Sequence, residues 1–530
     1  MFKRVIAAFL GAVMLGSCSA QESGSDAEST SIRQTLSTPA AVTSMIADAS
    51  AAETVSAESS NTDRSNDLNY PFLTLEEKKQ YCGSHYPDKT VLTWVLPNTV
   101  SHEKALNDYL YSNGYPYVIC FKSIMEETFS KNMTFADIVS EMKQNNDQVD
   151  IIDSCGRING QDVVSNLYYY FSAKGIYEPL DQYLADEKFT PYYSSLPRSY
   201  WDTYKYNGHI YGIDNSYSSL SVDSGFEFYL DVLEKTGLEA PELDGTLPEC
   251  SEKLTSFLKT VKKPLSLVMY FHTFDMLAAN RIEDTIVLSD KKAVNVFEQP
   301  YALEFYKACR RLSDKGLARI DNEPADDSVG TFITARATEG KNQVNPELKT
   351  VRVFSKVNNR ICSPYHAIGV FSGSLHKEEA ADALINIIYN KELNNIVTYG
   401  VEGKDYNIAD GYAVPADKAL KVDTALNNPL VSLPCRCIPN VIAPFDCEKL
   451  YSSAEYLDGF GFLFDGTDIK EDYLKVAKLI TGFTLQSAKS EADVENYLNK
   501  FNKELYDNGL QTVLDEVNRQ YEEFIEKGSN

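Results

Sequence analysis

Apolar and polar positions alternate in blocks over the first folded stretch of the chain, and the blocks predict strands separated by helices. Two near-continuous apolar runs, Val91–Leu96 and Tyr117–Phe121, have the length of fully buried strands, and Val149–Ile152 makes a third. Between them, apolar residues recur at helical spacing, first over 101–112 and then after Thr134. This β-α-β-α-β order predicts a parallel α/β layer.

Polar residues mark where several helices should begin. Ser101 precedes the first helix, and Thr134 and Ser490 each have an aspartate three residues later, which is the spacing of a capping box. A helical apolar stripe follows Ser374 and ends at Gly400, and two more occupy 494–505 and 513–524. The pattern therefore predicts an α/β body followed by a helical C-terminal region.

The amino terminus has the pattern of a secretory signal. Lys3 and Arg4 precede an apolar run too short to span a membrane, and the tetrad Leu-Gly-Ser-Cys ends at Cys18. This tetrad resembles the bacterial lipobox, which implies a signal peptide at 1–17 and lipidation of Cys18. A soluble secreted protein is the alternative. Residues 19–69 contain no aromatic side chain, so we expect 18–70 to be a disordered tether.

Length and charge narrow the choice of partners. The 530 residues exceed one hydrophobic core, so at least two packed units are expected. The 76 Asp and Glu residues outnumber the 50 Lys and Arg residues, for a formal net charge of −26. Such a surface repels phosphate backbones and anionic headgroups. We therefore expect no nucleic-acid partner, and membrane attachment through the lipid anchor alone.

Cysteine and histidine spacings give no pattern typical of a metal site. The six histidines include no H-E-x-x-H, and the cysteines include no paired C-x-x-C. Cys435, Cys437 and Cys447 leave metal binding or pairing open, but buried or free thiols are the expectation. No metal and no cofactor are predicted. The nine cysteines after Cys18 stand at positions 82, 120, 155, 250, 309, 362, 435, 437 and 447.

Five segments, in order, resemble the bacterial extracellular solute-binding proteins that deliver sugars to ABC importers. The chain segments are VDIID at 149–153, GIYEPLD at 175–181, GHIYGI at 208–213 after Trp201, FYLDVLEKTG at 228–237, and the stretch from AIGV at 367 to YGVEGKDY at 399–406. GFLFD at 461–465 and the last two helices resemble the additional C-terminal region of a lipoprotein branch of that family.

The resemblance implies a type II periplasmic-binding-protein-like fold with two α/β lobes joined by a hinge. The first lobe is expected at 88–217 with 363–400, and the second at 218–362 with 401–450. A helical region is expected at 451–530. The implied function is capture of a carbohydrate, an oligosaccharide in our prediction, for the permease subunits of an ABC importer at the outer face of the cell membrane.

Candidate ligand residues come from strand ends and from the chemistry of sugars. Ligands collect beyond the carboxyl ends of parallel strands, where Asn98, Asp153 and Ser154 are placed. Sugars also offer flat C–H faces to aromatic rings and hydroxyls to polar groups. Trp94, Tyr217, Tyr270 and His272 are candidates on that ground, and Arg336 and Tyr365 are candidates from their place near the lobe junction.

Enzymatic and structural alternatives were weighed against a binding protein. Ser101 to Lys104 is an S-x-x-K, and Lys235 to Gly237 is a K-T-G, as in serine acyl-transfer enzymes. However, the K-T-G has helical spacing and no S-D-N lies between the two. A surface glycan hydrolase would need two carboxylates in a cleft, and no spacing in the sequence singles out such a pair. An adhesion or scaffold lipoprotein would show repeats. We therefore predict that the chain is not an enzyme.

Overall fold

The computed structural model describes residues 73–124, 133–154, 163–215, 219–220, 223–268, 281–283, 286–321, 327–335, 342–345, 349–356, 360–364, 366–416, 425–429, 431–435 and 447–527. The predicted signal peptide, Cys18 and the predicted tether lie outside these residues, as do Tyr217, Tyr270, His272, Arg336 and Tyr365. Within the described part of the chain, no helix is long and apolar enough to cross a membrane.

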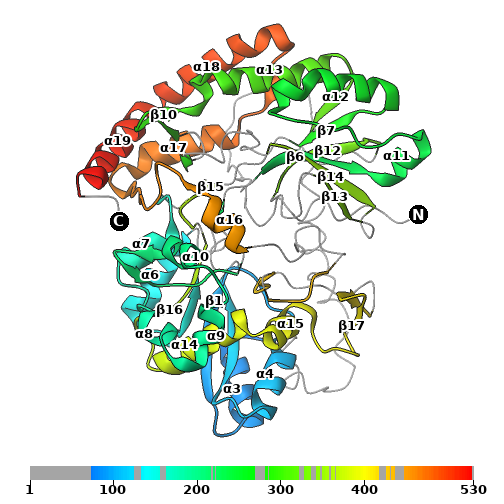
Figure 1. The fold of residues 1–530 in the computed structure, drawn as a ribbon. Coiled ribbons are helices and arrows are strands. Elements are labelled where there is room, and N and C mark those ends of the chain that lie inside the picture. Colours follow the sequence, from blue (N-terminus) through cyan, green and yellow to red (C-terminus); the bar gives the residue numbers. More distant parts are fainter. Residues whose placement is uncertain are drawn as a thin grey trace, which may run out of the picture.

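Two sheets, each with its own buried core, form two lobes that lie one above the other in Figure 1. The first sheet has the strand order β16-β3-β1-β2. Parallel pairing places Trp94 opposite both Phe121 and Ile151, and β16 joins β3 in the antiparallel sense. The bounds are Thr90–Leu96 for β1, Tyr117–Ser123 for β2, Ile151–Asp153 for β3 and Ile368–Val370 for β16. The predicted α/β class is confirmed.

Helices cover the first sheet largely where the sequence predicts them. Thr134 and Asp137 make the expected capping box. Ser101 does not cap the helix that follows it, because His102 holds the N-cap position there, and its side chain makes no capping hydrogen bond. The apolar stripe after Ser374 divides into two helices at Asn390, whose side chain caps the second. The bounds are Leu75–His85 for α3, Glu103–Ser112 for α4, Phe135–Asn145 for α6, Leu167–Ala173 for α7, Lys377–Tyr389 for α14 and Lys391–Tyr399 for α15.

Smaller elements complete this lobe. A two-stranded hairpin and three short helices follow α7, in the stretch that leads to the second lobe. Their bounds are Asp181–Leu184 for α8, Thr190–Tyr193 for α9, Arg198–Thr203 for α10, Lys205–Tyr206 for β4 and His209–Ile210 for β5.

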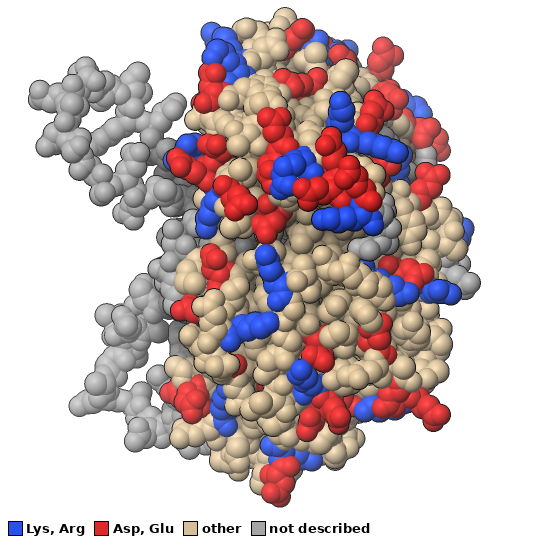
Figure 2. Space-filling model, turned by 90° about the vertical axis from the view of Figure 1, so that its left-hand side faces the viewer, with Lys and Arg blue, Asp and Glu red and all other residues tan. Residues whose placement is uncertain are grey.

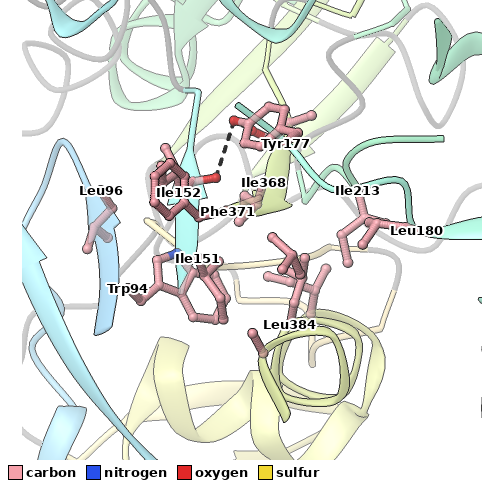
Figure 3. Packing of buried hydrophobic residues seen from close by; sticks show 14 of the residues in the cluster. Trp94, Leu96, Ile151, Ile152, Tyr177, Leu180, Ile213, Ile368, Phe371 and Leu384 are labelled. Atoms are coloured by element: carbon pink, nitrogen blue, oxygen red, sulfur yellow. Dashed lines mark hydrogen bonds between the residues drawn. The ribbon is translucent and has the colours of Figure 1, made fainter. Parts of the chain in front are cut away.

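The first core packs the strands against α14 and the residues that follow α7 (Figure 3). Trp94, Ile151 and Ile368 have no exposed surface, and Leu384 of α14 reaches toward them from below in this view. The hydroxyl of Tyr177 donates to the backbone oxygen of Ile152 at 3.3 Å. This buried phenol therefore keeps its polar end satisfied inside an apolar cluster.

The second sheet is mixed, with the order β11-β7-β12-β6-β14-β13. Its central strand β6 is antiparallel to both neighbours, whereas β7 is parallel to β11 and β12. The strands are β6 at Asp223–Tyr229, β7 at Leu265–Val268, β11 at Ala318–Asp321, β12 at Gly330–Ala335, β13 at Asn342–Asn345 and β14 at Thr350–Lys356. A smaller sheet has β8 at Arg281–Glu283, β9 at Ile286–Ser289 and β10 at Lys292–Asn295, and the helices are α11 at Leu230–Thr236, α12 at Leu247–Val261 and α13 at Pro300–Asp314.

The C-terminal helices pack on the second lobe, where they form its upper and left-hand edge in Figure 1. Leu498, Phe501 and Leu505 of α18 are buried there, as their helical spacing predicts. Ser490 precedes a short 3₁₀ turn and makes no side-chain cap, so the predicted capping box is wrong at this position. The bounds are Cys447–Ser453 for α16, Lys470–Thr481 for α17, Val494–Asp507 for α18 and Leu510–Glu526 for α19.

The described residues between 401 and 435 lie against the first lobe. Asn394 of α15 donates to the backbone oxygen of Leu426 at 2.9 Å and accepts from the backbone of Asn428 at 2.8 Å. The hairpin of β17 (Tyr406–Ala409) and β18 (Tyr412–Pro415) packs beside Tyr399. This differs from the division expected from the sequence, because the amides of α15 bind the returning chain. Cys435 is disulfide-bonded, which corrects the expectation of thiols at this position.

Acidic and basic side chains are intermixed on the face shown in Figure 2 rather than gathered into one acidic surface. Ion pairs along the C-terminal helices illustrate the pattern: Arg519 binds Glu516 at 2.6 Å, and Lys475 binds Glu471 at 2.9 Å. Exposed pairs of this kind contribute little to stability, about 0–1 kcal/mol each. They do limit the local field that a net charge of −26 would otherwise create.

Candidate functional site

Among the described residues, three segments of chain lie at the junction of the lobes and are joined by backbone hydrogen bonds. Ile213 and Ile368 exchange backbone hydrogen bonds of 2.9 and 2.8 Å, and the backbone of Cys362 donates to Ser219 at 2.9 Å. The third segment contains β19 (Glu455–Tyr456), which pairs in parallel with β15 (Arg360–Ile361) of the second segment. The junction is thus a small set of extended strands.

A buried polar chain lies where the first two crossings meet the carboxyl end of β3. Nε2 of His366 lies 2.7 Å from Oδ1 of Asp153, and Nδ1 lies 3.1 Å from Oδ1 of Asp214. The Tyr204 hydroxyl donates to the other Asp214 oxygen at 2.6 Å. The side chains of His366, Asp153 and Asp214 are 7%, 4% and 0% exposed. Residues from four separate stretches of sequence therefore meet at one point.

The geometry of His366 places a carboxylate oxygen beside each of its ring nitrogens. A neutral imidazole has one N–H and can donate to only one carboxylate, whereas the imidazolium donates from both nitrogens. With a carboxylate oxygen at each nitrogen, the charged ring satisfies both contacts. A histidinium between two aspartates also lowers the cost of burying their charges.

Tyrosines enclose this chain on the side of the first lobe. The Tyr200 hydroxyl lies 3.3 Å from the Asp214 backbone oxygen and 3.1 Å from the Tyr389 hydroxyl. Burial, followed by the charge of Asp214, raises the pKa of Tyr204 well above its usual value, so the phenol stays a donor. The ring of Tyr177 packs directly against the backbone of Gly369. A Cβ at position 369 would lie 2.5 Å from that ring, so glycine is required for this close approach.

Solved structures with a similar fold include the N-glycan transport solute binding protein (NgtS) from Streptococcus pneumoniae. The match has a TM-score of 0.59 and 18% identity, and it covers 83% of this chain and 100% of that one. The fold is that of a solute-binding protein. The structure of NgtS in complex with Man1GlcNAc matches with a TM-score of 0.55 at 17% identity, over 82% of this chain and 99% of that one.

Sequence comparison agrees with this solute-binding fold. A carbohydrate ABC transporter substrate-binding protein from Streptococcus pneumoniae serotype 4 is 21% identical over 411 residues, which are 71% of this chain and 82% of the relative. A family model described as a domain of unknown function (DUF3502) matches residues 459–526. The predicted resemblance to carbohydrate-delivering solute-binding proteins is confirmed. The relatives are substrate-binding proteins rather than enzymes, in agreement with the prediction.

Four of the predicted site residues fall within the described part of this solute-binding fold. Asp153 is the last residue of β3 and belongs to the buried polar chain, and Asn98 is half-buried just after β1. Ser154 binds the return strand instead, since its hydroxyl donates to the backbone oxygen of Ala367 at 2.7 Å. Trp94 is fully buried in the first core, against Phe121. Trp94 is therefore a core residue, and its role as a ligand contact stays a prediction.

Sequence reasoning missed His366 and Asp214. Each directly adjoins a segment that was recognised: His366 precedes the AIGV segment, and Asp214 follows GHIYGI. The signal in the sequence is a titratable residue directly beside an apolar run that forms part of a sheet. Such a residue is buried with the run, and a buried polar group needs a polar partner. The identity of that partner depends on tertiary pairing.

Metal binding and acyl transfer find no structural support among the described residues. No group of three or more His, Cys, Asp or Glu side chains is arranged to hold a metal ion within them. Gly237 of the K-T-G ends α11 in the left-handed conformation, with φ of 67°, so this motif is a helix cap as predicted. Lys104 of the S-x-x-K binds Asp108 at 2.6 Å along its own helix.

Proposed function

We propose that this chain is the substrate-binding protein of a carbohydrate ABC importer, and that its solute is an oligosaccharide held between the two lobes. The observation that supports this most directly is the colinear match to a carbohydrate ABC transporter substrate-binding protein over 71% of the chain, together with the solute-binding fold. Complexes of NgtS with Man1GlcNAc and Man5GlcNAc favour a branched or linear oligosaccharide over a monosaccharide.

The junction chemistry suits such a binder. Asn98 offers an amide with exposed surface at the carboxyl edge of the first sheet, close in sequence to the strand that carries Trp94. An amide both donates and accepts, as pairs of sugar hydroxyls require. Asp153, Tyr217, Tyr270, His272, Arg336 and Tyr365 remain proposed contacts. Binding needs no covalent step, since stacking and hydroxyl pairing alone favour closure of the lobes.

A thermal-shift screen of oligosaccharides, followed by calorimetry, tests the proposal. We expect one class of glycan, with mannose-rich N-glycan fragments as the first probes, to raise the melting temperature and to be recovered uncut. Asn98→Ala should weaken its binding about tenfold or more. Asn113→Ala, at the C-cap of α4, is the control. Cleavage products in the same sample would instead support a glycan hydrolase. No change in melting temperature and no binding heat with any glycan would refute sugar binding.

We further propose that the protein is held at the outer face of the cell membrane by lipid on Cys18. Several acyl chains on one residue would anchor it firmly, since each buried methylene contributes about 0.8 kcal/mol. Cys18→Ser should release the protein into the medium. The unsubstituted chain should partition into the detergent phase and should carry a labelled acyl chain. Retention of the Cys18→Ser variant in the membrane fraction would contradict the lipid anchor.

A further inference from the structure

Helix α3 is fixed along the edge of the first sheet by residues on one face. Lys78, Cys82 and Tyr86 are spaced four residues apart along the helix and its C-terminal cap, so they point the same way. Nζ of Lys78 donates to the backbone oxygen of Phe121 at 2.9 Å, and the Tyr86 hydroxyl donates to Asp108 at 2.9 Å. The helix is therefore fixed to β2 through Lys78 and to α4 through Tyr86.

Between these two contacts, a cysteine of the helix faces a cysteine of the strand. The Sγ atoms of Cys82 and Cys120 lie 3.5 Å apart, and neither side chain has exposed surface. Asn107 fixes the strand beside them, since its side chain exchanges two hydrogen bonds of 2.7 Å with the backbone of Ile119. Its amide nitrogen also approaches the Cys82 sulfur at 4.0 Å. Both thiols are thus held face to face in a small separate core.

From this placement we propose that Cys82 and Cys120 are a disulfide-forming pair whose oxidation ties α3 to β2. A disulfide has an S–S distance of about 2.0 Å, so the sulfurs must approach by about 1.5 Å, within the range of a side-chain rotation. The bond would fasten the first described helix, which follows the proposed tether, to the body that binds the solute. The inference does not depend on which solute that is.

The reaction requires an electron acceptor, and we assign that role to a disulfide of the oxidoreductase or small-molecule class. The thiolate of one cysteine attacks a sulfur of the acceptor, which forms a mixed disulfide and releases one acceptor thiol. The thiolate of the second cysteine then attacks the first, which forms the protein disulfide and releases the other acceptor thiol. Two protons leave the cysteines, and the two electrons reduce the acceptor to two thiols.

Burial sets the order of folding and oxidation. The hydrogen bond to Cys82, followed by burial, raises the pKa of Cys120 well above its usual value, so the docked pair is a poor nucleophile. Oxidation therefore belongs to the stage before α3 docks, when the thiols are accessible. Once docked, the bond is shielded from reductants by the surrounding aromatic side chains of Tyr81 and Tyr86.

The test is to refold the full chain with oxidised glutathione or with dithiothreitol, alkylate it in denaturant, and map unreduced peptides by mass spectrometry. We expect the peptides carrying Cys82 and Cys120 to be joined after oxidation and separate after reduction. Cys120→Ser is the matched control, in which Cys82 should become alkylated. Alkylation of both cysteines after oxidative refolding would overturn the proposal, and this measurement needs no variant.

Hydrogen exchange tests the structural consequence. Amides of α3 should exchange at least about tenfold more slowly in the oxidised protein than in the reduced one, while α18 amides should be unchanged. Joined peptides with equal exchange in both states would show that the bond does not fasten α3, and would refute that part of the proposal.

Discussion

The two lobes fill their cores with different aromatic residues. In the first lobe, the buried rings are mainly tyrosines whose hydroxyls bind neighbouring segments: Tyr168 donates to the Tyr204 backbone oxygen, and Tyr177 to that of Ile152. In the second lobe, the rings are mainly phenylalanines, and Phe297 packs on Phe483 and Phe501 at centroid distances of 5.0 and 5.1 Å. The first core therefore relies on directed hydrogen bonds as well as packing.

This difference follows from what each core joins. The first core includes the buried junction, where polar groups of two crossing segments and of the carboxyl end of β3 meet and need partners. The second core joins a sheet to helices more than a hundred residues later in the sequence, and apolar contact is enough for that. Hydrogen bonds specify the position of the crossings, whereas packing tolerates small shifts. We expect the two lobes to respond differently to substitution.

The largest effects should come from removing one large ring from each core. Trp94→Ala and Phe297→Ala should each lower the free energy of unfolding by about 3–5 kcal/mol, because each leaves a cavity. Both tryptophans of the chain, Trp94 and Trp201, are buried in the first lobe, so tryptophan fluorescence follows that lobe. Circular dichroism follows both.

Denaturant titrations then separate the lobes. Trp94→Ala should shift the fluorescence transition of Trp201, and Phe297→Ala should shift only the dichroism transition. Equal shifts of both signals in both variants would show that the lobes unfold as one unit. Fluorescence that responds to Phe297→Ala alone would contradict the assignment of separate cores.

The next effect concerns the buried histidine of the junction. His366→Ala should lower the free energy of unfolding by about 3 kcal/mol, because it removes the ring that binds both buried carboxyl groups, those of Asp153 and Asp214. His209→Ala is a matched control, since this exposed histidine lies 3.2 Å from Asp181 and its loss should cost about 0–1 kcal/mol. Similar losses in the two variants, measured by fluorescence, would refute the special role of the buried chain.

The sequence predicts the first lobe better than the second, for a physical reason. Its strands β1, β2 and β3 are consecutive along the chain and buried on both faces, so each appears as an apolar run. The strands of the second sheet come from distant parts of the chain and form no such consecutive pattern. The spacing of apolar residues in the segment at 228–237 predicts a helix, although its first two residues end β6. In a mixed sheet with strands drawn from distant positions, local pattern carries less information.

The candidate site shows the same division. Asp153 is predictable because it ends a recognisable strand, and Asn98 because it follows one. His366 and Asp214 acquire their role only when two crossing segments are placed side by side, which no local spacing encodes. Trp94 illustrates the opposite case, since an aromatic residue near a strand end suits a ligand contact and a core residue equally well from sequence alone.

A smaller effect depends on pH in the first lobe. Burial raises the pKa of Glu103 to about 7, although Lys78 at 2.6 Å opposes the shift. The folded form therefore keeps a proton that the unfolded chain releases near its usual pKa of about 4.3. This contribution, about 1–3 kcal/mol, is present below the unfolded pKa and is lost as pH rises through about 7.

Unfolding followed by tryptophan fluorescence between about pH 5 and pH 8 measures this dependence. Glu103→Gln should flatten the profile, because the amide does not titrate. Glu76→Gln, on the exposed side of α3, should leave the slope unchanged. A Glu103→Gln profile as steep as that of the unsubstituted protein would assign the pH dependence to other groups.

The smallest effect concerns the contact between α13 and the turn before α18. Nε of Arg311 donates to Glu491 at 2.8 Å, but both side chains are more than a third exposed, 34% and 37%. Water and salt screen such a pair, so Arg311→Ala should cost less than about 1 kcal/mol, measured by dichroism, and the cost should shrink in high salt. If the loss instead matched that of Phe297→Ala and persisted in salt, directed polar contacts would organise the second lobe as well, and the contrast between the two cores would fail.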